Sequence, residues 1–254
     1  MEKFRCTWLV LGFFAVWEIV PRAGLVSPLL LPPFSQVIAS LFEIIYTGQL
    51  FVDLSASLKR SLLGFFLSVL VGIPLGFLTG WYKKFEQYTD LLSQGFRNTS
   101  TFALMPIFLL FFGLGETSKI AIVFWGSVWG ILINTTSGVK TIDPIYVKAA
   151  KSLGLSDFDM FVKVILPASV PAIVSGMRVS AKTAFMVIIA AEMMGAKSGI
   201  GFYIQNAQYN FMIPEMYAGI LVLSVLGVTL NYSLILLEKK ATSWRGEIDS
   251  AIIG

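Results

Sequence analysis

Long runs without a charged side chain dominate the pattern of hydrophobic and polar positions along this chain. About 20 apolar residues suffice to cross the hydrocarbon core of a bilayer. Each of the following uncharged runs is close to that length and is predicted to be a membrane-spanning helix: Ser61–Tyr82, Asn98–Gly115, Ile120–Val139 and Met216–Leu237.

Two further segments are predicted to span the membrane. Val164–Ala196 is interrupted by three charges but is long enough for a helix entry and one span, and Cys6–Val20 contains Glu18 and is expected to stop at Pro21. A cleaved signal is not expected, because no small-residue cleavage site follows and further spans do. The sequence therefore predicts an all-α polytopic membrane protein with about six transmembrane helices, forming a single domain over residues 1–254.

The distribution of basic residues predicts the orientation of these spans. If the N-terminus is cytoplasmic, the inside segments and the inner end of the fifth span hold 14 of the 19 Lys and Arg residues, which satisfies the positive-inside rule. These are Lys3, Arg5, Lys83, Lys84, Arg97, Lys140, Lys148, Lys151, Lys163, Arg178, Lys182, Lys239, Lys240 and Arg245. Both termini are then cytoplasmic, and the pI near 9.1 needs no nucleic-acid partner.

The residue types that are missing from the sequence exclude most kinds of catalytic and metal site within one chain. There is no histidine, and Cys6 is the single cysteine, so disulfides, thiolate metal sites and Ser/His/Asp catalysis are excluded. No GxxxxGK[ST] phosphate loop occurs. We therefore expect no enzyme activity and no cofactor or metal in this chain; movement of a solute across the membrane fits the composition better.

One charged island, Tyr146–Pro167, lies between the apolar segments, in a loop of about 143–167 that the orientation places in the cytoplasm. Asp143 before Pro144 predicts a helix start, and Gly154 predicts its end. Ser156 and Asp159 are typical of a variant capping box for a second helix, which Pro167 is expected to end. The pattern predicts a helical hairpin, and spacing alone leaves open whether it is a docking element or a plain interfacial hairpin.

Polar residues inside the apolar segments are candidates for a translocation pathway. Arg178 and Lys182 share one helix face and could reach the cytoplasmic surface or contact substrate. Glu192 is expected near the outer end, either hydrated at the pathway mouth or bonded to backbone N–H groups of residues 195–201. Phe202–Met216 is too polar to span and is expected to form a re-entrant or interfacial helix over the pathway. Its candidate pathway residues are Gln205, Asn206 and Tyr209, although an interfacial belt would also use Tyr and Phe.

Glycines recur at four- and eight-residue intervals in the predicted second span, at positions 64, 72, 76 and 80. Such spacing favours close helix packing. Either a dimer interface or a seam within one chain would use it.

The island also carries a motif. The run KAAxxxG, followed nine residues later by VILP, extends from Lys148 to Pro167 and resembles the EAA loop of ABC-importer permeases, E-A-A-x3-G-x9-I-x-L-P. Lys148 stands where that family usually has glutamate, and Val164 where it has isoleucine. The segments Leu31–Val37, Ser57–Phe65 and Ala190–Ala196 are similar to the nitrate/sulfonate/taurine branch of these permeases.

This resemblance implies a type I ABC-importer permease in a bacterial inner membrane, working as a dimer (of two identical chains or with a paralogue). It implies two cytoplasmic ATPase subunits, which carry ATP and Mg, and an extracytoplasmic solute-binding protein. The expected solute is a small anion such as nitrate, a sulfonate or taurine. The residues implied in ATPase coupling are Tyr146, Lys148, Ala149, Ala150, Gly154, Leu155 and Pro167. The alternative is a stand-alone secondary transporter or channel driven by an ion gradient, which predicts inverted repeats and buried acidic ion sites.

Overall fold

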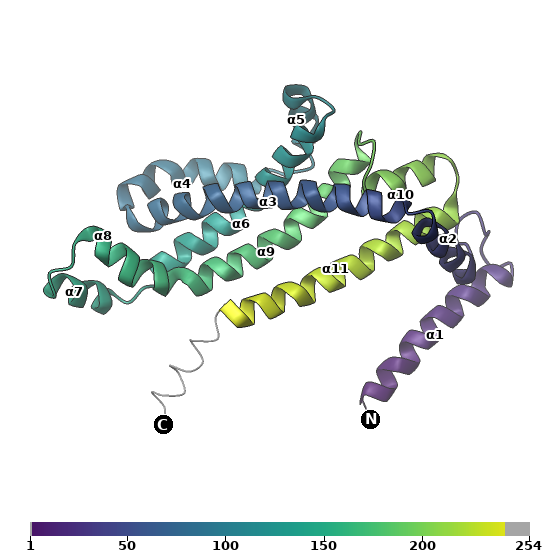
Figure 1. Cartoon of the computed structure of the whole chain (residues 1–254), viewed down its shortest axis with the longest axis horizontal. Coiled ribbons are helices and arrows are strands. Elements are labelled where there is room, and N and C mark those ends of the chain that lie inside the picture. The colour runs from purple at the N-terminus through teal and green to yellow at the C-terminus, as the bar shows by residue number, and fades with distance from the viewer. Residues whose placement is uncertain (1, 242–254) are drawn as a thin grey trace. The chain divides into compact units, whose positions relative to one another are not determined.

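The structure is a computed structural model that describes residues 2–241, and every regular element in that range is helical (Figure 1). In chain order these elements are α1 (Glu2–Arg22), α2 (Phe34–Tyr46), α3 (Gln49–Trp81), α4 (Lys83–Asn98), α5 (Met105–Phe112), α6 (Glu116–Lys140), α7 (Pro144–Ser152), α8 (Asp157–Met160), the π-helical turn η1 (Phe161–Ile165), α9 (Leu166–Met193), α10 (Ile200–Tyr209) and α11 (Ile213–Ala241). Arg245, one of the cations used to predict the orientation, lies outside the described residues.

Four helical stretches are long and apolar enough to cross a membrane: α3, α6, the continuous run Asp157–Met193 and Ile213–Lys240 of α11. They overlap four of the six predicted spans. The predicted first span falls in α1, which does not stop at Pro21 but includes it and ends at Arg22.

The prediction of one spanning helix over Asn98–Gly115 is wrong. Helix α4 ends at Asn98, Thr99 is extended, and α5 begins only at Met105, with Pro106 in its first turn. A run of Ser and Thr competes for backbone hydrogen bonds and favours turns, and a proline is tolerated at a helix start because no N–H is needed there. The uncharged run is therefore split, and its helical part has eight residues.

The chain divides into two compact units, one of residues up to 57 together with 192–226 and the other of residues 58–191 together with those from 227 onward. In the first unit, side chains of α1 hold the segment that leads into α2. The Trp17 indole N–H donates to the Pro32 carbonyl at 3.1 Å, and the Glu18 carboxylate accepts from the Ser35 backbone N–H at 2.8 Å and from its hydroxyl at 2.9 Å.

In the second unit, α3 and α6 run alongside each other with their backbones in close approach (Figure 1). A Cβ added at Gly76 would lie 2.5 Å from the Thr135 Cβ, and one at Gly64 would lie 2.6 Å from a Val123 methyl carbon. The facing pairs are Gly64 with Val123, Gly72 with Ile131, Gly76 with Thr135 and Gly80 with Val139. Since the residue numbers of the facing positions increase together along the two helices, α3 and α6 are parallel. The glycine spacing thus forms a seam within one chain.

Helices α4 and α9 run antiparallel to α6 in the same unit. Glu86 of α4 forms an ion pair with Lys140 at the end of α6, whereas Phe96 packs its ring against Trp125 and Trp129, earlier in α6. On the α9 side, Gly126, Gly130 and Gly138 of α6 meet Val187, Ser180 and Ala172 in turn. Helix α4 therefore provides the return path between the parallel helices α3 and α6.

This arrangement corrects the placement of Arg97. The sequence-based orientation put Arg97 in an inside loop, but it is part of α4 and lines a cavity together with Trp129, the fourteenth of the 25 residues of α6. The loop was predicted because α4 is too polar to resemble a span.

Candidate functional site

The charged island folds as the predicted helical hairpin, α7 followed by α8. The Asp143 side chain accepts from the Ile145 N–H at 2.9 Å and caps α7. Gly154 has φ +73° just beyond α7, and the Leu155 N–H donates back to the Ala150 carbonyl at 3.2 Å, which closes the helix end. The Ser156 hydroxyl accepts from the N–H of the residue three positions later, so the second cap is also confirmed.

The expectation that Pro167 ends the second helix is wrong. After α8 the backbone passes through the π-helical turn η1 and continues into α9, with Pro167 as the second residue of α9. A π-helical turn adds one residue and shifts the hydrogen-bond register, so the missing N–H of a proline can be accommodated without breaking the helix. The hairpin therefore leads without interruption into a long helix.

The inner face of the hairpin belongs to the core of the second unit. Ala150, Met160 and Ile165 are buried in one cluster with Phe77 of α3 and Val139 of α6. This packing ties the hairpin to the C-terminal ends of α3 and α6.

The outer face of the hairpin is apolar and exposed. Ile145, Tyr146, Leu153 and Phe158 expose 66%, 62%, 79% and 76% of their surface. The hairpin is small, yet it exposes four large apolar side chains and is held in place by its buried inner face. Such a surface marks an interaction site.

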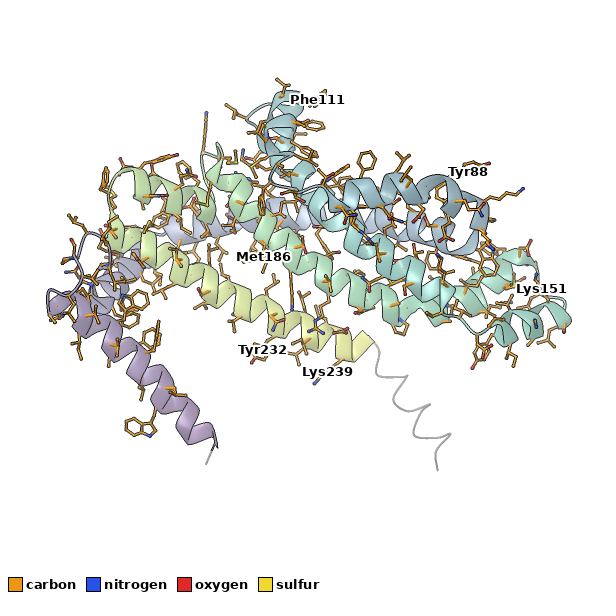
Figure 2. The ribbon with its side chains drawn as sticks, turned by 180° about the vertical axis from the view of Figure 1, so that it is seen from behind. Tyr88, Phe111, Lys151, Met186, Tyr232 and Lys239 are labelled. Carbon is orange, nitrogen blue, oxygen red and sulfur yellow. The ribbon has the colours of Figure 1, made fainter. Side chains whose placement is uncertain are left out.

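The predicted coupling residues do not all share that outer face. Exposed members are Tyr146, Lys148, Ala149, Gly154 and Pro167; Leu155 is half-buried and Ala150 is buried. Lys148 makes no ion pair among the described residues. Lys151, labelled in Figure 2, also lies on this hairpin.

Glu192 forms part of a buried cluster in the first unit that caps α10. The N–H groups of the N-cap residue and of the first two residues of α10 are each taken by a different side chain. Gly199 N donates to Asp53 Oδ1 at 2.8 Å, Ile200 N to Ser57 Oγ at 3.0 Å and Gly201 N to Glu192 Oε2 at 3.1 Å. The Ser57 hydroxyl in turn donates to the Glu192 carboxylate, 2.7 Å from Oε2. We call Asp53, Ser57 and Glu192 the α10 cap.

The α10 cap satisfies donors that a helix start leaves unpaired, and two carboxylates complement the positive end of the helix dipole. Its three side chains are 0–1% exposed. Of the two placements considered for Glu192, bonding to backbone N–H groups is the one observed. Asp53 and Ser57 were missed as partners because they lie more than 130 positions away, and no local pattern reports such a contact.

Gly199 is required at the centre of this cap. Its φ is +117°, and a Cβ there would lie 2.3 Å from the Glu192 carboxylate. Glycine alone combines that backbone conformation with so close an approach.

The other predicted pathway residues fall into two groups. In the second unit, Arg178 of α9 forms an ion pair with Glu238 of α11, an acid that the sequence analysis had not considered, and Lys182 is half-buried one turn further along. In the first unit, the Gln205 amide donates to the Tyr209 hydroxyl at 2.8 Å and Asn206 is exposed. These contacts do not test whether the residues serve the translocation pathway, so that role stays a prediction.

The second unit contains a polar cavity that sequence reasoning missed, which we call the α4 pocket. It has a volume of about 270 Å³ and lies between α3, α4 and α6. Its α4 side is formed by Glu86, Asp90, Ser93, Gln94 and Arg97. These positions follow the i, i+4, i+7, i+8, i+11 spacing of one helix face, a signal present in the sequence.

The opposite face of α4 is apolar and exposed, with Tyr88 81% and Leu91 82% exposed (Figure 2). Helix α4 is thus amphipathic, and its polar face is turned toward α6. Asp90 and Arg97 lie on that polar face, line the pocket and are both exposed.

Comparison with known proteins identifies the class of the chain. Residues 72–242 match the family described as binding-protein-dependent transport system inner membrane component. The putative aliphatic sulfonates transport permease protein SsuC of Bacillus subtilis is 34% identical over 235 residues, covering 92% of this chain and 85% of that protein. The taurine transport system permease protein TauC of Escherichia coli is 33% identical over 238 residues, covering 92% and 86%.

A solved structure of inward-facing conformations of the MetNI methionine ABC transporter superposes with a TM-score of 0.65 at 17% identity, covering 75% of this chain and 94% of that one. At that identity it supports the fold alone, which is that of a type I ABC-importer permease. The chain belongs to the family of binding-protein-dependent transport permeases. It is an inner-membrane transport component of an ABC importer, which confirms the resemblance and decides against the stand-alone transporter.

Proposed function

We propose that this chain forms the translocation pathway of an importer for a small organic solute bearing an acidic group, with sulfonates as the first class to test. Two relatives at 33–34% identity are named for aliphatic sulfonates and for taurine, and both kinds of solute carry a sulfonate. The matches cover 85% and 86% of these relatives, which supports carrying the solute class over to this chain.

The docking of separate ATPase subunits at the hairpin is the second part of the proposal. The observation that carries it is the two-sided construction of α7 and α8: Ala150 and Met160 anchor the inner face, while Leu153 and Phe158 expose an apolar outer face. A rigid element with an uncovered apolar surface can transmit a force applied to it. ATP and Mg would be held by these partner subunits, since this chain has no phosphate loop.

The remaining assembly follows from the same proposal. Two permease chains would pair, an extracytoplasmic binding protein would deliver the solute, and both termini would be cytoplasmic. The excess of Lys and Arg on the hairpin side of the membrane supports this orientation. Arg178, Lys182, Glu192, Gln205, Asn206 and Tyr209 stay candidates for the pathway.

The docking claim is tested by placing a charge on the outer face. With tagged permease co-expressed with its ATPase subunits, Leu153→Asp and Phe158→Asp are expected to lower the amount of co-purified ATPase by about tenfold or more, because a charge would replace an apolar anchor in the interface. Lys83→Asp is the control, since Lys83 is exposed at the first residue of α4, outside the hairpin. Wild-type recovery of ATPase with both hairpin variants would contradict the proposal.

A further inference from the structure

The α4 pocket contains four charged side chains, and two of them already neutralise each other. Lys140 of α6 is paired with Glu86, whereas Arg97 has no ion pair or hydrogen bond among the described residues. Asp90 accepts one hydrogen bond, from the Gln94 amide to Oδ2 at 2.7 Å. One guanidinium and the second oxygen of one carboxylate therefore remain available in the cavity.

The two available groups lie on the same face of α4 at a defined separation. Asp90 and Arg97 are seven residues apart, which places their Cα atoms about 10 Å apart along the helix axis. The Asp90 carboxylate stays close to its own backbone, whereas the long Arg97 side chain can reach back toward it across Ser93, because helical side chains lean toward the helix N-terminus. A ligand held at both ends would therefore be a few bonds long.

The opposite wall of the pocket has an apolar part and a polar part, the latter with the hydroxyls of Thr79, Thr136 and Ser137. Leu132 and Ile133 of α6 line it together with Trp129, whose indole N–H has no hydrogen-bond partner among the described residues. Such a wall suits a short carbon chain, and the indole adds one donor. A volume near 270 Å³ is below the usual range for drug-sized ligands, so the pocket suits a small solute.

The balance of charge selects among small solutes. A cation would be repelled by Arg97, and an anion without a positive group would meet the uncompensated Asp90. A guanidinium forms bidentate hydrogen bonds with planar or tetrahedral oxyanions, and a carboxylate accepts readily from an ammonium group. A molecule that carries both charges satisfies both residues.

We propose that the α4 pocket binds the transported solute as a small zwitterion, an aminosulfonate or a compound of the same charge pattern. Arg97 takes the acidic group, Asp90 takes the ammonium group, and the carbon chain lies against Leu132 and Ile133. This inference rests on the proposed function, because it places a solute inside the permease itself. It assigns specificity to residues of α4 that neither the coupling motif nor the candidate pathway residues include.

The single cysteine allows a direct test in the assembled transporter. In a Cys6→Ser background, Ser93→Cys places one thiol in the pocket, and its rate of modification by a small methanethiosulfonate reagent is measured in liposomes. The probes are taurine, isethionate (the same sulfonate with a hydroxyl in place of the amine) and ethylamine. Taurine is expected to protect the thiol at about tenfold lower concentration than either single-charge probe, since each lost charge-assisted contact is worth about one factor of ten.

Two substitutions assign the ends of the ligand. Arg97→Gln should abolish protection by taurine and isethionate, and Arg97→Lys should restore part of it. Asp90→Asn should make the protection of the thiol by taurine as weak as its protection by isethionate. Gln87→Cys, on an exposed part of α4 that does not line the pocket, is the control and should show no protection.

Equal protection by taurine and isethionate in the parent would overturn the zwitterion assignment, and absence of protection, or equal protection at position 87, would overturn the site. Recovery of ATPase with the same preparations separates this result from the proposed function. If the ATPase subunits co-purify and taurine gives no protection, the pocket inference alone fails. If the parent chain recovers no ATPase, the docking proposal fails.

Discussion

The α10 cap and the α4 pocket are both polar clusters in a mostly apolar chain, yet their hydrogen bonding differs. In the cap, both Asp53 oxygens, the Ser57 hydroxyl and the Glu192 carboxylate all have protein partners, and the cluster is buried. In the pocket, Arg97 has none among the described residues and Asp90 has one. A saturated cluster stabilises the fold, whereas an unsaturated one that is open can bind a ligand.

The largest expected effect would come from breaking the saturated cluster. Glu192→Ala removes the acceptor of the Ser57 hydroxyl and of the Gly201 N–H, and each buried donor left unpaired costs about 1–3 kcal/mol. We expect a marked drop in the thermal unfolding temperature of the detergent-solubilised chain and in the yield of folded protein. Melting at the wild-type temperature would show that the cap does not stabilise the chain.

The Glu192→Gln variant separates the cap from a pathway role. An amide oxygen in the place of Oε2 can still accept from both the Ser57 hydroxyl and the Gly201 N–H, so most of the stability should be kept. If Glu192 also serves the pathway, uptake should fall in this variant while assembly is preserved. Unchanged uptake would leave Glu192 with the cap alone.

Substituting one serine in each cluster sharpens the comparison, with a smaller expected change in stability. Ser57→Ala should destabilise the chain by about 1–3 kcal/mol, since it orphans the Ile200 N–H in a buried site. Ser93→Ala should leave the unfolding temperature nearly unchanged, because Ser93 is only half-buried, lines the pocket and has no hydrogen-bond partner among the described residues. Equal shifts for both serines would remove the distinction between the two clusters.

The smallest effect is expected at Arg178, whose pairing is intermediate between that of the saturated cap and that of the pocket. It has one partner, Glu238, and both side chains are partly exposed. Arg178→Gln should cost about 1 kcal/mol or less, as is usual for ion pairs whose side chains are partly exposed. A double-mutant cycle with Glu238→Gln measures the coupling, and a coupling well above that value would place the pair with the buried cap.

What the sequence could predict depended on how local each feature is. The hairpin caps at Asp143 and Ser156 and the turn at Gly154 were confirmed, because each depends on residues three to five positions apart. The α10 cap could not be located in advance because Ser57 and Glu192 are brought together by tertiary packing. The α4 face was available as a spacing pattern, but α4 was interpreted as a loop. Pro167 and the run Asn98–Gly115 were misjudged, because a π-helical turn kept one helix intact and a polar turn split the other.

The packing of α4 has a mechanical consequence. Helices α3 and α6 are joined along a seam in which glycine backbones touch facing side chains, so separating them would open a gap along their length. Helix α4 has no buried residue, and extended residues flank it at Tyr82 and Thr99. Tilting α4 would uncover no core residue of its own, although it would strain the Glu86–Lys140 ion pair and the contacts of the Phe96 ring with α6. The α4 wall of the pocket is therefore easier to shift than its base. A binding site built in this way can tighten around a solute and release it while the rest of the unit keeps its shape.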